Sequence, residues 1–191
     1  MFMVKTFGYR YLLRADLYLD GEDATDFLQS QFTNDLRPFD CGRCTYGLWL
    51  DVKGRVQADA YVLQTGATSF RLISEHSAGE SIRSHLEHHI IADDVEIDSV
   101  SGGSFGLSLI GADAVGILRD LSIEVPDAGS WAGTEHLAIF SGRRSGEDNF
   151  ECIFKREDDY TAVCGKLELA GVGFVSDDVI DFERSAAGYP L

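Results

Sequence analysis

The chain has 191 residues, a length that allows one ordinary domain or two small domains that share a core. Its 16 lysines and arginines stand against 32 aspartates and glutamates, and the net charge of −16 disfavours direct binding of nucleic acid or anionic lipid. With 45% hydrophobic residues the chain can bury a core, but no apolar run approaches the roughly 20 residues of a membrane helix. The N-terminus shows no signal-peptide pattern, so we expect a cytoplasmic protein without a membrane partner.

In chain order, alternating apolar residues predict a strand over residues 11–19, and a helix begins after Gly21-Glu22-Asp23. A second alternation runs through residues 46–63 on both sides of a glycine-centred turn, which predicts a β-hairpin. A short strand follows at residues 70–73. Ser77-Ala78-Gly79-Glu80 then has the spacing of a capping box and predicts the start of the next helix.

The second half repeats this mixture of strands and helices. The expected strands are residues 95–99, 105–109, 136–140 and 150–154, with a turn at Gly102-Gly103, a loop at 126–133 and a polar turn at 142–148. The expected helices are residues 114–121, a helix around 160–170 closed by Gly171, and a last helix from Ser176 to Gly188 with Pro190 beyond.

The hairpin is the most clearly patterned stretch. We expect its buried face to comprise the alternating apolar residues of both arms, which are Leu48, Leu50, Val52, Val56, Ala58, Ala60 and Val62. Lys53-Gly54-Arg55 forms the turn, where glycine is free to adopt positive φ. Asp51 and Asp59 lie along the arms. A solvated turn with gatekeeping charges is the simplest interpretation of this stretch by itself.

Four cysteines provide little sign of redox or metal chemistry. Cys41 and Cys44 form a C-x-x-C, but this pair follows a helix and precedes a strand, whereas a redox pair begins a helix after a strand. Cys152 and Cys164 fall in an expected strand and an expected helix, so they do not supply the second pair of a structural zinc site. We expect reduced, partly buried thiols.

Other catalytic motifs are weak or missing from the sequence. His85 and His89 have a metal-compatible helical spacing, but no third ligand is evident, so we expect a polar helix flank and no metal. The sequence contains neither a G-x-x-x-x-G-K-[ST] phosphate loop nor a G-x-S-x-G nucleophile elbow.

An internal repeat organises the chain into two halves. Leu17, Leu19, Gly21, Asp23, Ala24, Phe27 and Leu28 recur at one offset as Leu107, Leu109, Gly111, Asp113, Ala114, Ile117 and Leu118. Each copy predicts a strand, a glycine corner with an aspartate at the helix start, and an amphipathic helix. We therefore expect an α+β fold of two related, intertwined subdomains, at about residues 10–100 and 101–191, each an antiparallel sheet with helices on one face.

Several segments carry a resemblance to a known family. Residues 21–29 with Thr33-Asn34-Asp35 resemble the opening of the folate-binding superfamily, which comprises the aminomethyltransferase T-protein of glycine cleavage and the YgfZ-type proteins. The turn Lys53-Gly54-Arg55 is more similar to the YgfZ branch. Further similarity lies in residues 91–97, 109–111, 146–151 and 184–190, so the resemblance covers the chain from about residue 10.

The resemblance implies that tetrahydrofolate or a derivative lies in a central hole and is gripped partly by these two subdomains. Glu151 matches the glutamate whose carboxylate accepts hydrogen bonds from the pteridine edge. Asp59 matches the second member of an acidic pair near the folate nitrogens and Ala58 the first, and the sequence leaves open which member the chemistry needs. Arg184 matches an arginine of the closing helix, with a helix-end salt bridge as the alternative role. We also expect the basic hairpin tip to hold the glutamyl carboxylates through Lys53 and Arg55.

Three functions stay open at this point. The first is a folate-binding module of one-carbon metabolism, or of iron–sulfur or RNA-modification maintenance, without full catalytic activity. The second is an aminomethyltransferase that uses Asp59 to orient or deprotonate the attacking folate nitrogen, and the third is a ligand-free assembly protein. We find neither the family's C-terminal β-barrel nor the K-G-C-Y-x-G-Q-E segment of the YgfZ branch after residues 188–190, so we expect either a naturally short member or the folate-binding portion alone. Both alternatives favour the first function. The face left open predicts a partner chain or self-association.

Overall fold

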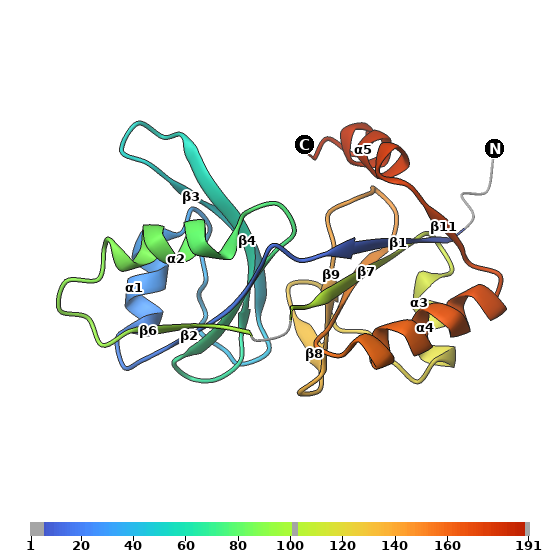
Figure 1. Cartoon of the computed structure of the whole chain (residues 1–191), viewed down its shortest axis with the longest axis horizontal. Coiled ribbons are helices and arrows are strands. Elements are labelled where there is room, and N and C mark those ends of the chain that lie inside the picture. The colour runs from blue at the N-terminus through green and yellow to red at the C-terminus, as the bar shows by residue number, and fades with distance from the viewer. Residues whose placement is uncertain (1–5, 101–102, 190–191) are drawn as a thin grey trace. The chain divides into compact units, whose positions relative to one another are not determined.

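A computed structural model describes residues 6–100 and 103–189 of the chain. These residues form two compact units, drawn in Figure 1, and each unit is described by itself. Unit 2 comprises Leu13–Gly103, and unit 1 comprises Met1–Leu12 together with Ser104–Leu191. The first strand is thus part of the unit formed by the second half of the chain, so the two halves are intertwined as predicted.

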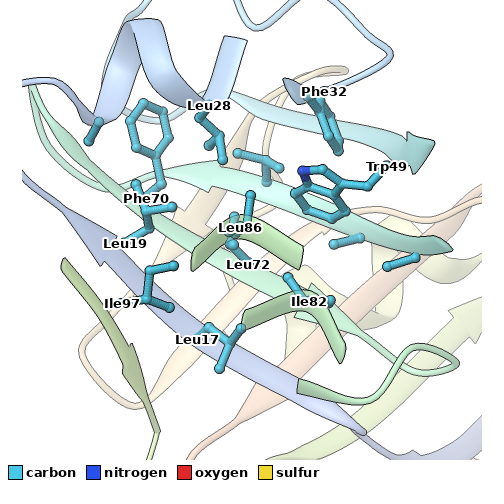
Figure 2. Packing of buried hydrophobic residues seen from close by; sticks show 14 of the residues in the cluster. Leu17, Leu19, Leu28, Phe32, Trp49, Phe70, Leu72, Ile82, Leu86 and Ile97 are labelled. Carbon is cyan, nitrogen blue, oxygen red and sulfur yellow. The ribbon is translucent and has the colours of Figure 1, made fainter. Parts of the chain in front are cut away.

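Unit 2 is an antiparallel sheet with the strand order β3-β4-β5-β2-β6. Its elements are β2 (Ala15–Asp20), α1 (Ala24–Gln31), β3 (Cys44–Leu50), β4 (Val56–Gln64), β5 (Ser69–Ser74), α2 (Gly79–Glu87) and β6 (Glu96–Ser99). Both helices pack on the same face of the sheet, where they form one apolar core with the strands (Figure 2).

The periodicity of each element explains this packing. Leu17 and Leu19 of β2 point to the helix-covered face, where Leu28 of α1 and Ile82 and Leu86 of α2 meet them; all five are at most 2% exposed. Complete burial of such a side chain contributes roughly 1.5–3 kcal/mol to stability, so the core favours the sheet and its two helices together. Figure 2 shows these side chains converging from sheet and helices.

The buried face of the hairpin differs from the prediction on the β3 arm. Ala58, Ala60 and Val62 of β4 are buried as expected, but on β3 it is Trp49 that enters the core, at 0% exposure. Trp49 lies opposite Ala58, and the register then shifts at Leu50 through a bulge or similar irregularity. The expected inward residues are exposed instead, with Leu50 at 38%, Val52 at 103% and Val56 at 58%.

Unit 1 is a mixed sheet with the strand order β11-β1-β7-β10-β9-β8. Its elements are β1 (Phe7–Leu12), β7 (Phe105–Ile110), α3 (Ala114–Asp120), β8 (Trp131–Gly133), β9 (Leu137–Ser141), β10 (Asn149–Phe154), α4 (Glu157–Leu169), β11 (Gly173–Val175) and α5 (Asp177–Ala186). The β1–β11 pair is parallel and the other pairs are antiparallel. The α+β class with two sheets is therefore confirmed, with one parallel pair added.

The helices of unit 1 lie on both faces of its sheet. α3 and α4 pack with Leu107 and Leu109 of β7, whereas Ile180 of α5 packs with Tyr9 and Ile110, whose side chains point the other way. Figure 1 shows α5 on the opposite side of β1 and β7 from α3 and α4. The prediction of helices on one face thus omitted α5. The face that α5 partly covers is the one that carries Glu151.

Four local predictions need correction. The single strand expected at residues 11–19 is two strands, because β1 pairs with β7 in unit 1 while β2 pairs with β5 in unit 2. Two short strands, β8 and β11, lie where we expected a loop and a helix exit. Ser77 makes no side-chain cap for α2, whose N-cap is Ala78. The predicted turn residue Gly102 and the final Pro190 lie outside the described residues.

Both copies of the internal repeat turn from strand to helix at a glycine with positive φ. Gly21 has φ +145° and Gly111 has φ +128°, values that glycine tolerates and other residues rarely adopt. Asp23 and Asp113 are the N-caps, but neither makes a side-chain cap bond. The carboxylate of Asp23 instead accepts a hydrogen bond from the backbone N–H of Asp94 at 2.8 Å, which ties the corner to the segment before β6.

Candidate ligand-binding site

Glu151 lies in the middle of β10, directly opposite Ser108 of β7. The strand alternation that buries Phe150 and Cys152 against α3 and α4 points Glu151 to the other face of the sheet, where it is 1% exposed. Burial of a carboxylate is costly unless partners satisfy its oxygens. Glu151 is therefore a candidate site residue whose neighbours decide its chemistry.

Side chains of unit 1 already satisfy both oxygens of Glu151. Its Oε1 accepts a hydrogen bond from Arg144 Nε at 2.8 Å, from Ser108 Oγ at 3.1 Å and, more weakly, from Asn149 Nδ2 at 3.5 Å. Its Oε2 accepts one from the Tyr11 hydroxyl at 2.6 Å. A carboxylate offers about four lone-pair positions in all. Glu151 is thus the right chemical group for a pteridine edge, but Oε1 has no room for a further donor in this arrangement.

Arg144 is held in place by its own neighbours. It belongs to the turn between β9 and β10, and its backbone N–H donates to Asn149 Oδ1 at 2.8 Å. Its guanidinium carbon lies 4.3 Å from the centre of the Tyr11 ring and 5.0 Å from that of Tyr9, which are cation–π distances. Gly142 completes the arrangement, because a Cβ there would lie 2.4 Å from Glu151 Oε1.

Asp59 lies on β4, on the face of the unit 2 sheet that points away from α1 and α2. Its neighbour Ala58 points into the core, so the strand alternation gives the two positions opposite environments. Hydroxyl groups surround the half-buried carboxylate. Oδ1 accepts hydrogen bonds from Ser77 Oγ and from Ser74 Oγ, the latter at 3.1 Å, and Oδ2 accepts one from the Tyr46 hydroxyl at 3.2 Å. Oδ2 therefore has capacity for a further donor.

The hairpin tip is braced by Asp51. Its Oδ1 accepts hydrogen bonds from the backbone N–H groups of Lys53 at 2.8 Å and Arg55 at 2.9 Å, and its Oδ2 accepts one from Arg55 Nε at 2.6 Å. The hydrogen bonds from Arg55 hold the pKa of Asp51 below its usual range. Gly54 takes φ +76°, as the turn prediction requires. The tip presents Lys53 to solvent, while Arg55 is exposed but paired with Asp51.

Arg184 lies in the last turn of α5, where it is half-buried. The preceding residue Glu183 accepts a hydrogen bond from Ser145 Oγ at 3.3 Å, which ties α5 to the turn that carries Arg144. Within unit 1, Glu151 thus lies on β10, and Arg184 lies on α5, the helix that the turn before β10 contacts. Within unit 2 the structure places Asp59, Lys53 and Arg55 along one hairpin.

The cysteines and histidines of the described residues form no group of three or more that could hold a metal ion. Burial raises the pKa of the Cys44 thiol, whereas a redox C-x-x-C needs a lowered one. The ring centres of His85 and His89 lie 4.9 Å apart. The pKa of His85 is lowered mainly by burial and, to a smaller extent, by charge repulsion from His89 and His88. In the same described ranges, no helix combines the length and hydropathy needed to cross a membrane.

The partners of both acids were missed by sequence reasoning. Tyr11, Ser108 and Arg144 carry no local motif that links them to Glu151, because each comes from a different part of the chain. Ser108 could have been found only from the β7–β10 register. Ser77 was assigned to a capping box, but its hydroxyl donates a hydrogen bond to Asp59 and does not cap α2.

Comparison with known proteins gives a consistent picture. The family model described as GCVT N-terminal domain matches residues 14–171. An aminomethyltransferase of Exiguobacterium sibiricum is 28% identical over 88% of this chain and 49% of its own length. One from Bacillus subtilis is also 28% identical, over 91% of this chain and 52% of its own length. The chain therefore spans about half the length of these relatives.

Solved structures show the same fold. The aminomethyltransferase T of the glycine cleavage system from Bartonella henselae superposes with a TM-score of 0.83 at 19% identity, over 97% of this chain and 52% of that one. A chain of the heterotetrameric sarcosine oxidase from Corynebacterium sp. U-96 gives 0.58 at 15% identity, over 90% of this chain and 88% of that one. The chain belongs to the GCVT N-terminal domain family, in the folate-binding superfamily of the glycine-cleavage T-protein.

Proposed function

We propose that this chain binds a reduced folate, tetrahydrofolate or a derivative of it, through Glu151. The observation that carries the proposal is a carboxylate that is 1% exposed and sits among oriented donors, at the position where the family resemblance expects the pteridine contact. A buried carboxylate that accepts hydrogen bonds is suited to recognising an edge with two donors. Membership in the family supports this ligand class.

The other proposed ligand contacts are Asp59, Lys53 and Arg55 of the hairpin in unit 2 and Arg184 of α5 in unit 1. Asp59 Oδ2 accepts a hydrogen bond from a nitrogen of the ligand, while Ser77 and Ser74 hold Oδ1 in place. Lys53 and Arg55 attract the glutamyl carboxylates of the folate. Arg55 does so less strongly than a free arginine would, because its guanidinium is already paired with Asp51. Replacing both basic residues with alanine should weaken folate binding at low salt. Unchanged affinity would remove the tip from the site.

A second candidate function is aminomethyl transfer, favoured by the hydroxyl groups that hold Asp59 and by the relatives, which are aminomethyltransferases. Tetrahydrofolate would supply the nitrogen that accepts the one-carbon unit. Asp59 would orient that nitrogen or take its proton through Oδ2, which has the capacity to accept one. We rank binding without turnover first, with a role in one-carbon metabolism or, as in the YgfZ branch, in iron–sulfur or RNA-modification maintenance.

The decisive experiment is calorimetric titration of the chain with 5-formyltetrahydrofolate, beside the variants Glu151→Ala and Asp59→Ala. Saturable binding that Glu151→Ala abolishes supports the proposal, and absence of binding to the wild-type chain refutes it. Addition of tetrahydrofolate together with an aminomethyl-lipoyl donor protein then separates the two candidates, because only the enzyme releases methylene-tetrahydrofolate, with ammonia and the reduced dihydrolipoyl protein as the other products. A ligand-free assembly protein would neither bind folate nor respond to Asp59→Ala.

Partners and cellular location are part of the same proposal. The chain covers about half of its curated relatives, and a second polypeptide or a second copy would contact the exposed apolar side chains of the hairpin, Leu50, Val52 and Val56. Light scattering of the purified chain, beside a variant with Val52→Ser and Val56→Ser, tests self-association. We propose a cytoplasmic location, which fractionation of cells that produce the chain would check.

A further inference from the structure

Three histidines cluster at the C-terminal end of α2 in unit 2. His85 lies in the last turn of the helix, His88 is its C-cap and His89 follows. Together with Ser81 and Ser84 they line an open hollow of about 670 Å³. Imidazole is the commonest protein ligand for metal ions, so the geometry of these rings decides what the cluster can bind.

The hydrogen bonding of His89 fixes which of its ring nitrogens is free. Its Nδ1 lies 2.8 Å from the backbone carbonyl oxygen of His85. Because that oxygen can only accept, Nδ1 carries the proton, and in the neutral ring Nε2 keeps its lone pair. Metal-binding histidines are oriented in the same way, with the second ring nitrogen donating to a carbonyl or carboxylate. Among residues 6–100 and 103–189 the ring of His85 has no hydrogen-bond partner, so a lone pair of that ring is also available.

The distance between these two rings suits a shared metal ion. A metal–nitrogen bond of about 2.0–2.1 Å places the ion about 3.1 Å from the centre of an imidazole, so two rings bound at an angle of about 90–110° have centres about 4.4–5.1 Å apart. The centres of the His85 and His89 rings are 4.9 Å apart. Those of His88 and His89 are 5.4 Å apart with the rings edge to face, and adjacent residues do not share one face of a helix. The pair that fits a chelate is therefore His85 with His89.

The acid that lines the same hollow is already engaged. Glu87 forms an ion pair with Arg83 at 3.6 Å. The chain thus supplies two imidazoles, fewer ligands than the four of a structural zinc site. A two-histidine chelate leaves its other coordination positions to water, and its metal ion exchanges with solution.

We propose that His85 and His89 chelate a divalent transition-metal ion, which clamps the C-terminal end of α2. The proposal does not involve folate. It departs from the expectation of a polar helix flank without a metal, which rested on the missing third ligand, because a two-histidine chelate needs none. Imidazole suits nickel, copper and zinc, with copper bound most tightly, whereas magnesium and calcium prefer oxygen ligands. The net charge of −16 favours accumulation of cations around the chain.

The test is calorimetric titration with Ni²⁺ at about pH 7.5, where protons compete little for imidazole. All proteins carry Cys41→Ser, because the exposed thiol of Cys41 is a second potential ligand. We expect saturable binding of one ion, weakened about tenfold or more by His85→Ala and by His89→Ala, since each leaves a single ligand. His88→Ala and the distant control His136→Ala should bind within about twofold of the parent. Absence of saturable binding, or an equal loss in His88→Ala or His136→Ala, overturns the proposal.

A second readout uses the wild-type histidines and does not depend on the folding of a variant. Substoichiometric Cu²⁺ broadens the nuclear magnetic resonance signals of its ligands, so the ring protons of His85 and His89 should disappear before those of His136. Ni²⁺ should also raise the thermal midpoint of the parent, because an ion that bridges two residues of the folded helix end binds the unfolded chain less well. Equal broadening of all five histidines, or the same thermal shift in His89→Ala, refutes the chelate.

Discussion

Trp49 decides between two registers of the β3–β4 hairpin. The sequence pattern places Leu50 and Val52 inside, whereas the structure buries Trp49 completely and leaves Leu50 38% exposed. Replacement of a buried tryptophan by alanine costs about 3–5 kcal/mol, because it removes apolar contacts and leaves a cavity. We expect that loss for Trp49→Ala. Leu50→Ala should cost less than about 1 kcal/mol, since much of its side chain stays in water.

The assay is urea unfolding followed by far-ultraviolet circular dichroism, which does not rely on the fluorescence of the replaced residue. Trp49→Phe adds a sharper comparison, because the buried indole Nε1 has no hydrogen-bond partner among the described residues. Removal of an unsatisfied donor recovers about 1–3 kcal/mol, so phenylalanine should be far better tolerated than alanine. If Leu50→Ala proved as damaging as Trp49→Ala, the observed register would be wrong.

Three further predictions follow from other parts of the fold. Gly21→Ala should destabilise the chain by about 3 kcal/mol or more, because its Cβ would lie 1.9 Å from the Asp94 carbonyl oxygen at φ +145°. Gly54→Ala should cost only about 1–2 kcal/mol, because Gly54 has φ +76° but an added Cβ there would meet no atom within 4 Å. If thermal melts showed equal losses of stability for the two variants, the steric clash expected at Gly21 would be contradicted. The pKa of His85 is lowered from 6.5 in the folded chain, so the unfolded chain binds the proton more readily. Stability should therefore fall as pH drops below about 6.5, and His85→Gln should flatten that dependence in urea titrations. Cys41 should react with a thiol reagent before Cys44, whose raised thiol pKa leaves little thiolate; equal rates by peptide mass spectrometry would argue against that burial.

The sequence was sufficient for elements whose period is long and regular. The helices that begin near Ala24 and Ala114 were predicted with their buried faces, because apolar residues repeat at helical spacing after a glycine corner. The β3 arm failed because a shift of one residue sends every side chain of a strand to the other face, and an irregular register leaves no mark in the period. The strand at residues 11–19 failed because a continuous alternation gives no sign that the chain passes from one sheet to another.

The candidate site divides in the same way between what is local and what is distant. Glu151 and Asp59 were singled out by the family resemblance of the segments that contain them. The groups that bind them come from strands and turns far along the chain, and only pairing register brings Ser108 beside Glu151. A serine that caps a helix and a serine that donates a hydrogen bond to a distant carboxylate cannot be told apart in the sequence, so Ser77 was assigned the wrong role. The sequence can therefore nominate a candidate residue, whereas its hydrogen-bond partners become known only from the fold.

The strand geometry bears on the question of which acid of the family's pair matters. Position 58 points into the apolar core of unit 2, where Ala58 is 2% exposed, and position 59 points to the opposite face. A carboxylate at 58 would be directed away from the face that carries Asp59 and the hydroxyls of Tyr46 and Ser74. Alanine at 58 therefore removes no acid from that face, and it is no argument by itself for a lost activity. The pairing of Glu151 with Arg144 bears more directly on the proposed folate contact, because it occupies part of the hydrogen-bonding capacity of that carboxylate.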